Sequence, residues 1–319
     1  MNSLKYLKKK IYLAGYSGMV GSAIKRCLEK NGYANLVYKS IDQLDLIRQE
    51  KVEEFFSKEK PEIVIIAAAR VGGILANNTY RAQFIYDNLM IESNLIHSSY
   101  INKVEKLIFL GSSCIYPKLA PQPLKEEYLL ADYLENTNEP YAIAKIAGIK
   151  LCENYYKQYG CDFYSIMPTN MYGPNDNFDL NTSHVLPALL RKFHEAKINA
   201  LHSVTIWGTG KPLREFMYVD DLADGLCYLM ENVGSKNLYD KNLSFLNIGT
   251  GKDLTIAELA KMISEIVGFN GKIVYDHSKP DGTPRKLLDV SRINELGWKA
   301  KTELHDGIEK SYKWFVNNV

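Results

Sequence analysis

Short apolar segments alternate with longer segments of helical periodicity along the first half of the chain. Each apolar segment is closed by a glycine or a polar residue, and some are apolar on both faces, as buried parallel strands are. Strands that alternate with helices at this spacing predict an α/β fold with a doubly wound parallel sheet, the Rossmann arrangement. The predicted strands lie at 10–15, 35–38, 62–69, 106–110 and 162–167, and helices are predicted up to about residue 30, around 52–57 and at 80–102.

The pattern changes after about residue 171, where the stretch 175–182 is polar and irregular. A helix is expected to begin behind it with Ser183 as its N-cap, and Asp220 with Asp221 is expected to cap a further helix. Short strands are predicted at 204–207 and 216–219, and another helix at 255–267.

Two domains are therefore predicted, which suits a chain of 319 residues. The first is a cofactor-binding domain at 1–171 together with about 217–248. The second is a smaller C-terminal α/β substrate domain at 172–216 and 249–319.

Composition narrows the class of protein. The 39 basic and 37 acidic residues give a net charge of +2 without a basic stripe, which argues against a nucleic-acid partner. Five cysteines without C-x-x-C spacing indicate neither a disulfide framework nor a zinc cluster, and reduced thiols favour the cytoplasm. No signal-peptide pattern and no apolar run of about 18 residues occurs, so no membrane association is expected.

The first strand leads into three glycines spaced as G-x-x-G-x-x-G, namely Gly15, Gly18 and Gly21. In a dinucleotide-binding turn the first glycine permits the tight turn, the second lets the pyrophosphate approach, and the third lets the helix pack on the strand. The helix N-terminus then faces the anion with free N–H groups. Because the motif stands at the first strand-to-helix turn, it predicts a dinucleotide cofactor.

The strand at 106–110 ends in the heptapeptide GSSCIYP at 111–117. Ligands of open parallel sheets gather beyond the carboxyl ends of the strands, so Ser112 and Cys114 are candidates for chemistry. The alternative is a polar turn in which Cys114 acts as a small apolar residue.

Tyr141 and Lys145 lie four residues apart on a predicted helix and share one of its faces. A nearby ammonium favours the ionised form of a phenol, which is needed for acid–base work near neutral pH. An ordinary amphipathic pair is the alternative.

The glycine turn, Ser112 and the pair Tyr141/Lys145 occur in the order found in extended short-chain dehydrogenases/reductases, which the chain resembles. Over nearly its whole length it is similar to the GDP-L-fucose synthases, which convert GDP-4-keto-6-deoxy-D-mannose to GDP-L-fucose by 3,5-epimerisation and 4-reduction. The segments that carry this resemblance are AARVGGI at 68–74, ANNTY at 76–80, GSSCIYP at 111–117, TNEPYAIAKIAG at 137–148, MPTN at 167–170, SHV at 183–185 and KPDGTPRK at 279–286.

The resemblance implies roles for five residues. Ser112 and Tyr141 would donate to the O4 oxygen of the sugar, and Lys145 would keep the Tyr141 phenol acidic and hold the nicotinamide ribose. Cys114 and His184 would be the base and the acid of the epimerisation. A thiol and an imidazole suit this work because both titrate close to neutral pH.

It also implies the binding residues. The GDP-sugar would be held by Lys192, Trp207, Arg214, Asp281 and Lys286, with Lys192 standing where the family commonly has arginine. The cofactor would contact Gly15, Tyr16, Ser17, Gly18, Met19, Val20, Gly21, Leu110, Gly111, Ser112, Tyr141, Lys145, Pro168, Asn170, Met171 and His184.

NADPH is the expected cofactor, and NADH use is not excluded. Members that prefer NADP carry arginines where this chain has Ser17 and Ile41, but Lys39 is near and no acidic residue ends the second strand to select a free ribose hydroxyl. The superfamily also makes a homodimer the expected assembly.

Four other functions were weighed on the same residues. A 4,6-dehydratase needs an acid pair after Ser112, a 4-epimerase has no need of Cys114 and His184, and a non-catalytic sensor would lack Tyr141 or Lys145. The main alternative is a C4-reductase of a related GDP-4-keto-6-deoxy sugar, for example a heptose, with little or no epimerase activity.

Overall fold

A computed structural model describes residues 4–180, 182–279 and 281–319. Its centre is a six-stranded, entirely parallel sheet with the strand order β2-β1-β3-β4-β5-β9. The strands are β1 (Ile11–Ala14), β2 (Leu36–Val37), β3 (Ile63–Ile66), β4 (Lys106–Leu110), β5 (Phe163–Pro168) and β9 (Leu246–Ile248). The predicted doubly wound parallel sheet is confirmed.

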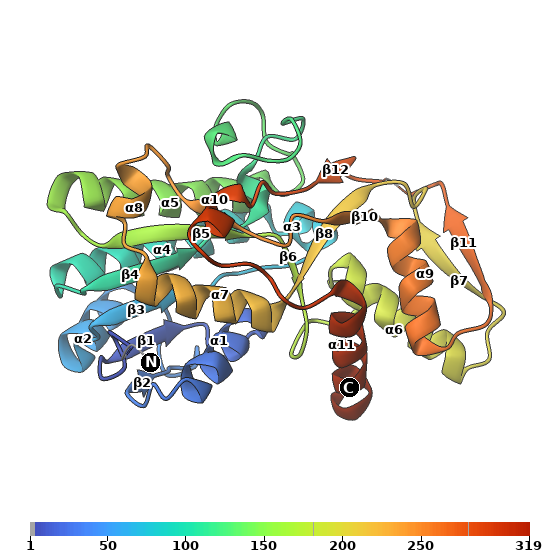
Figure 1. Cartoon of the computed structure of the whole chain (residues 1–319), viewed down its shortest axis with the longest axis horizontal. Helices are drawn as coiled ribbons and strands as arrows, with labels where there is room; N and C mark the ends of the chain where they lie inside the picture. Colours follow the sequence, from blue (N-terminus) through green and yellow to red (C-terminus); the bar gives the residue numbers. More distant parts are fainter. Residues whose placement is uncertain (1–3, 181, 280) are drawn as a thin grey trace.

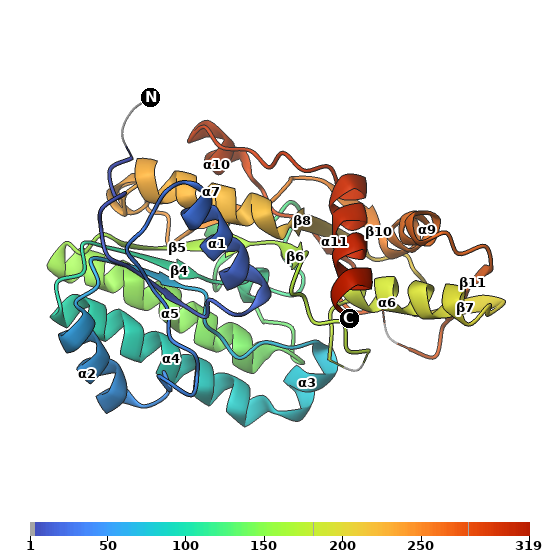
Figure 2. The same ribbon diagram turned by 90° about the horizontal axis from the view of Figure 1, so that it is seen from below.

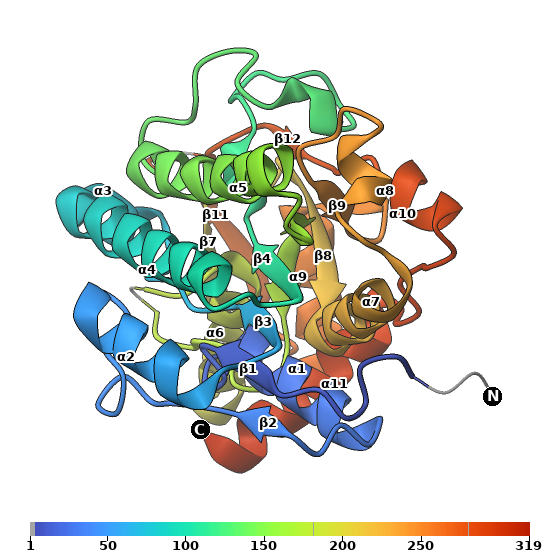
Figure 3. The ribbon, with the colours of Figure 1, turned by 90° about the vertical axis from the view of Figure 1, so that its left-hand side faces the viewer.

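Helices cover both faces of this sheet, as Figures 2 and 3 show. Alternate strand residues point to opposite faces, so Leu13, Ile65 and Ile108 pack against one helical layer, whereas Val64 and Phe109 pack against the other. The first layer contains α1 (Met19–Lys30) and α7 (Val219–Asn232); the second contains α2 (Gln49–Glu59), α4 (Arg81–Ile101) and α5 (Glu139–Tyr159).

The order of the strands places a topological switch between β1 and β3, because the chain proceeds from β1 to one side and then returns to the other. Gly15, directly after β1, lies against the backbone of Ala67 and Ala68, directly after β3. Ligands of open α/β sheets bind at this point, outside the carboxyl ends of the strands.

A second, smaller core lies beyond that edge, at the right of Figure 1. Its central strand β8 (Leu213–Tyr218) pairs in parallel with β6 (Asn170–Tyr172) and β12 (Arg285–Lys286) and antiparallel with β10 (Asp253–Thr255). A separate parallel pair is formed by β7 (Ser203–Trp207) and β11 (Lys272–Asp276). We call the region built on this core the outer lobe.

Three helices pack in the outer lobe around the side chains of Leu190, Phe193, Leu259 and Ile308. They are α6 (Val185–Ile198), α9 (Ile256–Val267) and α11 (Leu304–Asn318). Short helices complete the chain: α3 (Ile74–Thr79), η1 (Ser113–Ile115), η2 (Glu126–Tyr128), α8 (Lys236–Tyr239) and α10 (Ser291–Glu295).

Two predicted caps are wrong. His184, and not Ser183, is the N-cap residue of α6, and the Ser183 hydroxyl is buried without a hydrogen-bond partner among the described residues. Asp220 and Asp221 lie inside the first turn of α7, whose N-cap is Tyr218. Carboxylates in a first turn still interact favourably with the helix dipole, which explains why the sequence signal looked like a cap.

The described helices contain no segment that is both long and apolar enough to cross a membrane. The boundaries predicted for the two domains stay a prediction. The core of the outer lobe draws on 172–218, 254–275 and 304–315, whereas Leu288, Ile293 and Trp298, which lie within the predicted second domain, pack in the two cores of the central sheet.

Candidate active site

The glycine turn joins β1 to α1 as a tight backbone hairpin. Gly15 has φ +84°, and a Cβ there would lie 2.6 Å from the nitrogen of Ala68. At Gly21 a Cβ would overlap the carbonyl of Gly15. Gly18, by contrast, faces open space, with Gly15 O at 3.8 Å as the nearest atom to its missing Cβ, and no side chain caps the helix there. The turn therefore leaves room and free N–H groups for an anion at Gly18.

Around this turn, Tyr16 stacks obliquely on Tyr38 with ring centroids 5.2 Å apart, and the Lys25 ammonium lies 4.8 Å from the Tyr38 ring. Ser17 and Ile41 are exposed, and Lys39 lies 3.9 Å from a Glu59 carboxylate oxygen. Met19 and Val20 are partly buried against the sheet.

The end of β4 turns into the short helix η1. The Ser112 hydroxyl caps it by accepting from the N–H of Cys114 at 3.4 Å. Gly111 passes close to Met167 on the neighbouring strand, where a Cβ would lie 2.6 Å from the methionine sulfur. Leu110, Pro168 and Met167 are buried, so the polar groups of Ser112 and Cys114 stand at the rim of an apolar floor.

Helix α5 brings Tyr141 and Lys145 to the same rim. Both side chains are buried, at 9% and 3% exposure, and the Lys145 ammonium donates to the Leu110 carbonyl at 3.0 Å. The same nitrogen lies 4.4 Å from the centroid of Phe109 and 5.9 Å from that of Tyr141. Ser112, Cys114, Tyr141 and Lys145 are thus collected at the carboxyl end of β4.

The electrostatics of Tyr141 differ from the sequence-based expectation. Burial raises the pKa of the phenol well above its usual value, the neighbouring Cys114 thiol raises it further, and the hydrogen bond with Ser112 lowers it. Burial lowers the pKa of Lys145. The expected acidification of Tyr141 by Lys145 is therefore not what these surroundings produce; they hold the tyrosine in its protonated, proton-donating form.

His184 stands at the start of α6, next to α3. Gly73, which precedes α3, donates its N–H to Thr182 at 2.9 Å, so this loop is fixed against the sheet edge. His184 is exposed to solvent, although neighbouring protein atoms partly desolvate its imidazole. This desolvation lowers its pKa, and the charge of Lys286 lowers it further.

Two cations of the outer lobe are held in register. Arg214 on β8 is the direct strand partner of Lys286 on β12. Burial lowers the pKa of Arg214, and the nearby carboxylate of Asp281 opposes this shift. A small pocket is lined by both Lys286 and Cys114. Lys286 therefore lies at the thiol end of the site, with Arg214 beside it on the neighbouring strand.

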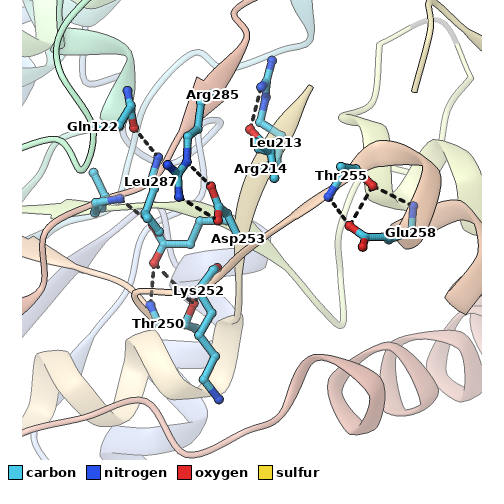
Figure 4. A network of polar contacts seen from close by, with 12 residues as sticks. Gln122, Leu213, Arg214, Thr250, Lys252, Asp253, Thr255, Glu258, Arg285 and Leu287 are labelled. Carbon is cyan, nitrogen blue, oxygen red and sulfur yellow. Dashed lines mark hydrogen bonds and ion pairs between the residues drawn. The ribbon is translucent and has the colours of Figure 1, made fainter. Parts of the chain in front are cut away.

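An ion pair lies next to Lys286 in the sequence. Arg285 on β12 donates to the Asp253 carboxylate on β10 through two hydrogen bonds of 2.6 and 3.2 Å, which Figure 4 shows. Gln122 accepts from the N–H of Leu287 at 3.0 Å and ties the following segment to the loop after η1. Strand β12 is thereby fixed at both ends.

Trp207 ends β7 with 59% of its surface exposed. The ammonium groups of Lys192 and Lys279 each lie 5.5 Å from its ring. Asp281 does not point to open space: its carboxylate accepts from the N–H of Thr209 at 2.6 Å and the Thr209 hydroxyl at 2.8 Å, so it anchors its own loop. An exposed indole beside two cations suits an aromatic base that carries a diphosphate.

Asn170 and Met171 lie on β6, where the chain passes from the sheet to the outer lobe. The Asn170 amide donates to the Glu215 carbonyl at 2.8 Å, and Met171 packs on the sheet core.

The buried carboxylates of Glu92 and Glu215 carry no sequence motif that marks them. Glu215 accepts three backbone N–H groups from loops between the sheet and the outer lobe. Glu92 is buried between α4 and α5 near Lys145. For Glu92, the available signal was its position as an acidic residue within the largely apolar segment NLMIESNLI at 88–96.

The fold and this site define a nucleotide-dependent oxidoreductase or isomerase of the short-chain type. Residues 11–244 match the model of the "NAD dependent epimerase/dehydratase family", and the chain belongs to that family.

Within the family, the chain is similar to GDP-L-fucose synthases. It is 56% identical to GDP-L-fucose synthase 1 of Arabidopsis thaliana, over 100% of this chain and 97% of that protein. It is 55% identical to the GDP-L-fucose synthase of Escherichia coli K12, over 98% of both. Among solved structures, a GDP-mannoheptose C4 reductase from Campylobacter jejuni with NADP bound is 45% identical with a TM-score of 0.89, covering 97% of this chain and 99% of that chain.

Proposed function

We propose that the chain converts GDP-4-keto-6-deoxy-D-mannose to GDP-L-fucose, by epimerisation at C3 and C5 followed by NADPH-dependent reduction at C4. The observation that carries the proposal is the group of hydroxyl, thiol, phenol and ammonium at the carboxyl end of β4, at the same edge of the parallel sheet as the glycine turn after β1. Full-length identity above half to GDP-L-fucose synthases supports it.

The proposed reduction uses the buried pair on α5. Tyr141 is kept protonated by its surroundings and can give its proton to O4 as negative charge develops there. Ser112, hydrogen-bonded to Tyr141, is a second donor to the same oxygen. The bound nicotinamide supplies the hydride to C4.

The proposed epimerisation uses the thiol and the imidazole. The hydrogens on C3 and C5 are both α to the C4 carbonyl, so removing either one leaves an enolate with its charge on O4. Cys114 acts as the base and His184 as the acid, and the donors that serve reduction stabilise the enolate. Lys286 connects the two groups, since it shares a pocket with Cys114 and its charge acts on His184.

The residues present fit a dinucleotide. Gly18 leaves an open cradle that a Cβ would fill, and α1 offers uncapped N–H groups for the pyrophosphate. Lys145 would hold the nicotinamide ribose. NADPH is the cofactor favoured, with Lys39 as the cation nearest to the end of β2 and Ser17 and Ile41 contributing no charge.

The GDP-sugar is assigned to the outer lobe. Trp207 offers an aromatic face for the guanine, and Lys192, Arg214 and Lys286 offer cations for the diphosphate. Asp281 supports the site through its loop, since its carboxylate is already bonded to Thr209.

A second function is favoured by one observation. The similarity to a GDP-mannoheptose C4 reductase extends over nearly the whole chain, so C4 reduction of a related GDP-4-keto-6-deoxy sugar, such as a heptose, with little epimerase activity is the alternative. The retained Cys114 and His184 favour the epimerase-reductase.

A homodimer and a cytoplasmic location are part of the same proposal. Five free cysteines suit a reducing compartment. Helices α4 and α5 pack against each other in one helical layer, which Figure 2 shows, and they carry exposed apolar side chains, among them Tyr86, Ile101 and Ile143.

The test is hydrogen exchange in D2O with the 4-keto substrate, with and without NADPH. We expect deuterium at C3 and C5 even without NADPH, because enolisation precedes reduction. Cys114→Ser should suppress exchange and leave NADPH-dependent reduction. Cys161→Ser is the matched control, because Cys161 is a half-buried thiol just beyond the far end of α5. It should change neither the exchange nor the reduction.

The outcomes separate the candidates. Reduction without exchange at either carbon would support the heptose-type reductase and contradict the epimerase part. Neither exchange nor NADPH consumption with any GDP-4-keto-6-deoxy sugar would contradict both proposed functions.

A further inference from the structure

An acidic side chain lies in the apolar interface between α4 and α5. Glu92 on α4 is 1% exposed, and neither of its carboxylate oxygens has a hydrogen-bond partner among the described residues. The N–H of Gly148 approaches it without reaching hydrogen-bond geometry, and this approach lowers the pKa of the carboxyl. A buried carboxyl with unsatisfied oxygens destabilises a fold relative to an apolar residue, so packing alone does not account for it.

Helix α5 makes room for this carboxyl. A Cβ on Gly148 would lie 2.9 Å from Glu92 Oε2 and 2.5 Å from the Phe109 ring. Gly148 is three residues after Lys145 and therefore on the same face of α5. The Glu92 carboxyl thus fills the space that a side chain at position 148 would take, one helical turn from Lys145.

Lys145 has no other anion nearby in the described part of the chain. Its ammonium donates to the Leu110 carbonyl and lies against Phe109, and it forms no ion pair with a carboxylate among the described residues. Glu92 is the charged group that acts on it, and the attraction favours the ammonium.

The other titratable groups that face Glu92 all lie on α5. They are Lys145, Tyr141 and the buried thiol of Cys152, while β4 contributes the Phe109 ring and β5 contributes Ser165 beside Cys152. Of these, only Lys145 carries a charge opposite to a carboxylate.

We propose that Glu92 is a positioning residue of the reduction step: its carboxylate, enclosed opposite Gly148, acts through Lys145 and Tyr141 to keep the ammonium charged and the phenol protonated. This deepens the proposed function and rests on it. Both forms are those that the reduction needs, since Tyr141 must carry the proton that it gives to O4.

The direction of the pH effect follows from the charges. Burial raises the pKa of Glu92 to about 8. As pH rises through that value, Glu92 gives up its proton, and the resulting negative charge holds the protons of Lys145 and Tyr141 to higher pH. A neutral residue at this position cannot do so, and Lys145 would then be the first to lose its proton.

The experiment compares Glu92→Gln, which removes the charge but keeps the shape, with Glu92→Asp, which keeps the charge. Rates of NADPH oxidation by full-length protein with GDP-4-keto-6-deoxy-D-mannose are measured from pH 6 to 10. The same rates are measured with NADPH deuterated at the transferred hydride. A slower rate with the deuterated cofactor shows that the measured rate reports hydride transfer. We expect the alkaline limb of the profile to move to lower pH by about one unit or more in Glu92→Gln, as removal of a close opposite charge requires. In Glu92→Asp it should move by less than half as much.

Glu153→Gln is the matched control, because Glu153 is also buried on α5 but is paired with Lys150 and Lys157. It should leave the alkaline limb in place. Thermal unfolding of each variant verifies that it is folded.

An unchanged alkaline limb in folded Glu92→Gln would overturn this inference while the proposed function stands. Equal shifts in Glu92→Gln and Glu92→Asp would also overturn it, since they would show a packing effect. A wild-type protein that oxidises no NADPH would overturn the proposed function itself.

Discussion

The three glycines of the first turn are not equivalent. Gly15 and Gly21 are required by the protein's own backbone, because a Cβ on either would press into main-chain atoms. Gly18 borders open space and is compatible with an ordinary side chain at φ −73° and ψ 170°. At the scale of single residues, two of the glycines serve the fold and one serves the ligand.

We therefore expect Gly18→Ala to unfold at the same temperature as the wild type but to bind NADPH at least about tenfold more weakly, because the methyl group occupies the pyrophosphate cradle. Gly21→Ala should lose at least about 3 kcal/mol of unfolding free energy, in the range of severe backbone clashes. Thermal unfolding and fluorescence titration with NADPH measure the two effects. Equal losses of stability in both variants would contradict the assignment of Gly21 to the fold and of Gly18 to cofactor binding.

At the scale of elements, Glu215 joins parts of the chain that secondary structure alone leaves apart. Its carboxylate, on β8, accepts from Thr250 and Gly251 at 2.6 and 2.8 Å and from Leu288 at 2.9 Å. Burial raises the pKa of this carboxyl, and the three bonds oppose the rise. One buried side chain thus fixes the turn after β9 and the segment after β12 to the same strand.

Glu215→Ala should lower the free energy of unfolding by about 3 kcal/mol, since one buried and two partly buried backbone N–H groups lose their acceptor at about 1 kcal/mol each. Glu258→Ala is the comparison: Glu258 forms the exposed capping box of α9 with Thr255, shown in Figure 4, and should cost about 1 kcal/mol. Urea denaturation measures both. A smaller loss in Glu215→Ala than in Glu258→Ala would show that Glu215 is not a tie between the loops.

The elements that could be predicted from sequence are those whose signal is local. Period and apolarity identified β1, β3, β4 and α9 closely, because these signals depend on burial of whole faces. The short helix α3 was missed in a glycine-containing loop, and the Ser183 cap was wrong, because a three-dimensional contact of Gly73 with Thr182 decides the geometry there.

The site was predicted in its identities and not in its electrostatics. Sequence order and the family resemblance located Ser112, Cys114, Tyr141 and Lys145, and the fold places them together. The pKa of Tyr141 and the presence of Glu92 behind Lys145 depend on burial between α4 and α5, which no local pattern reports.

At the scale of the whole molecule, the proposed contact between copies lies at the exposed apolar side chains of α4 and α5. Tyr86 and Ile101 on α4 are 56% and 60% exposed, and Ile143 on α5 is 40% exposed. Apolar side chains gathered on a helical face favour association.

Sedimentation equilibrium should give twice the chain mass of 36.3 kDa. Tyr86→Glu should weaken the dimer, because it places a charge in the apolar contact. Ile41→Glu, at an even more exposed position after β2, should leave the mass unchanged. A monomeric wild type at micromolar concentration would contradict the assembly, and dissociation by Ile41→Glu would contradict its location.

The core of the outer lobe comes from three separated stretches, around 172–218, 254–275 and 304–315, with sheet elements between them. A single genetic crossover between two such enzymes would therefore build the core of the outer lobe from stretches of two different proteins. Side chains from the two proteins would not fit together in that core. Substrate preference in this architecture is expected to diverge through substitutions such as those at Lys192 or Trp207 within an intact lobe. Chimaeras that exchange all three stretches together should fold, whereas those that exchange one should not.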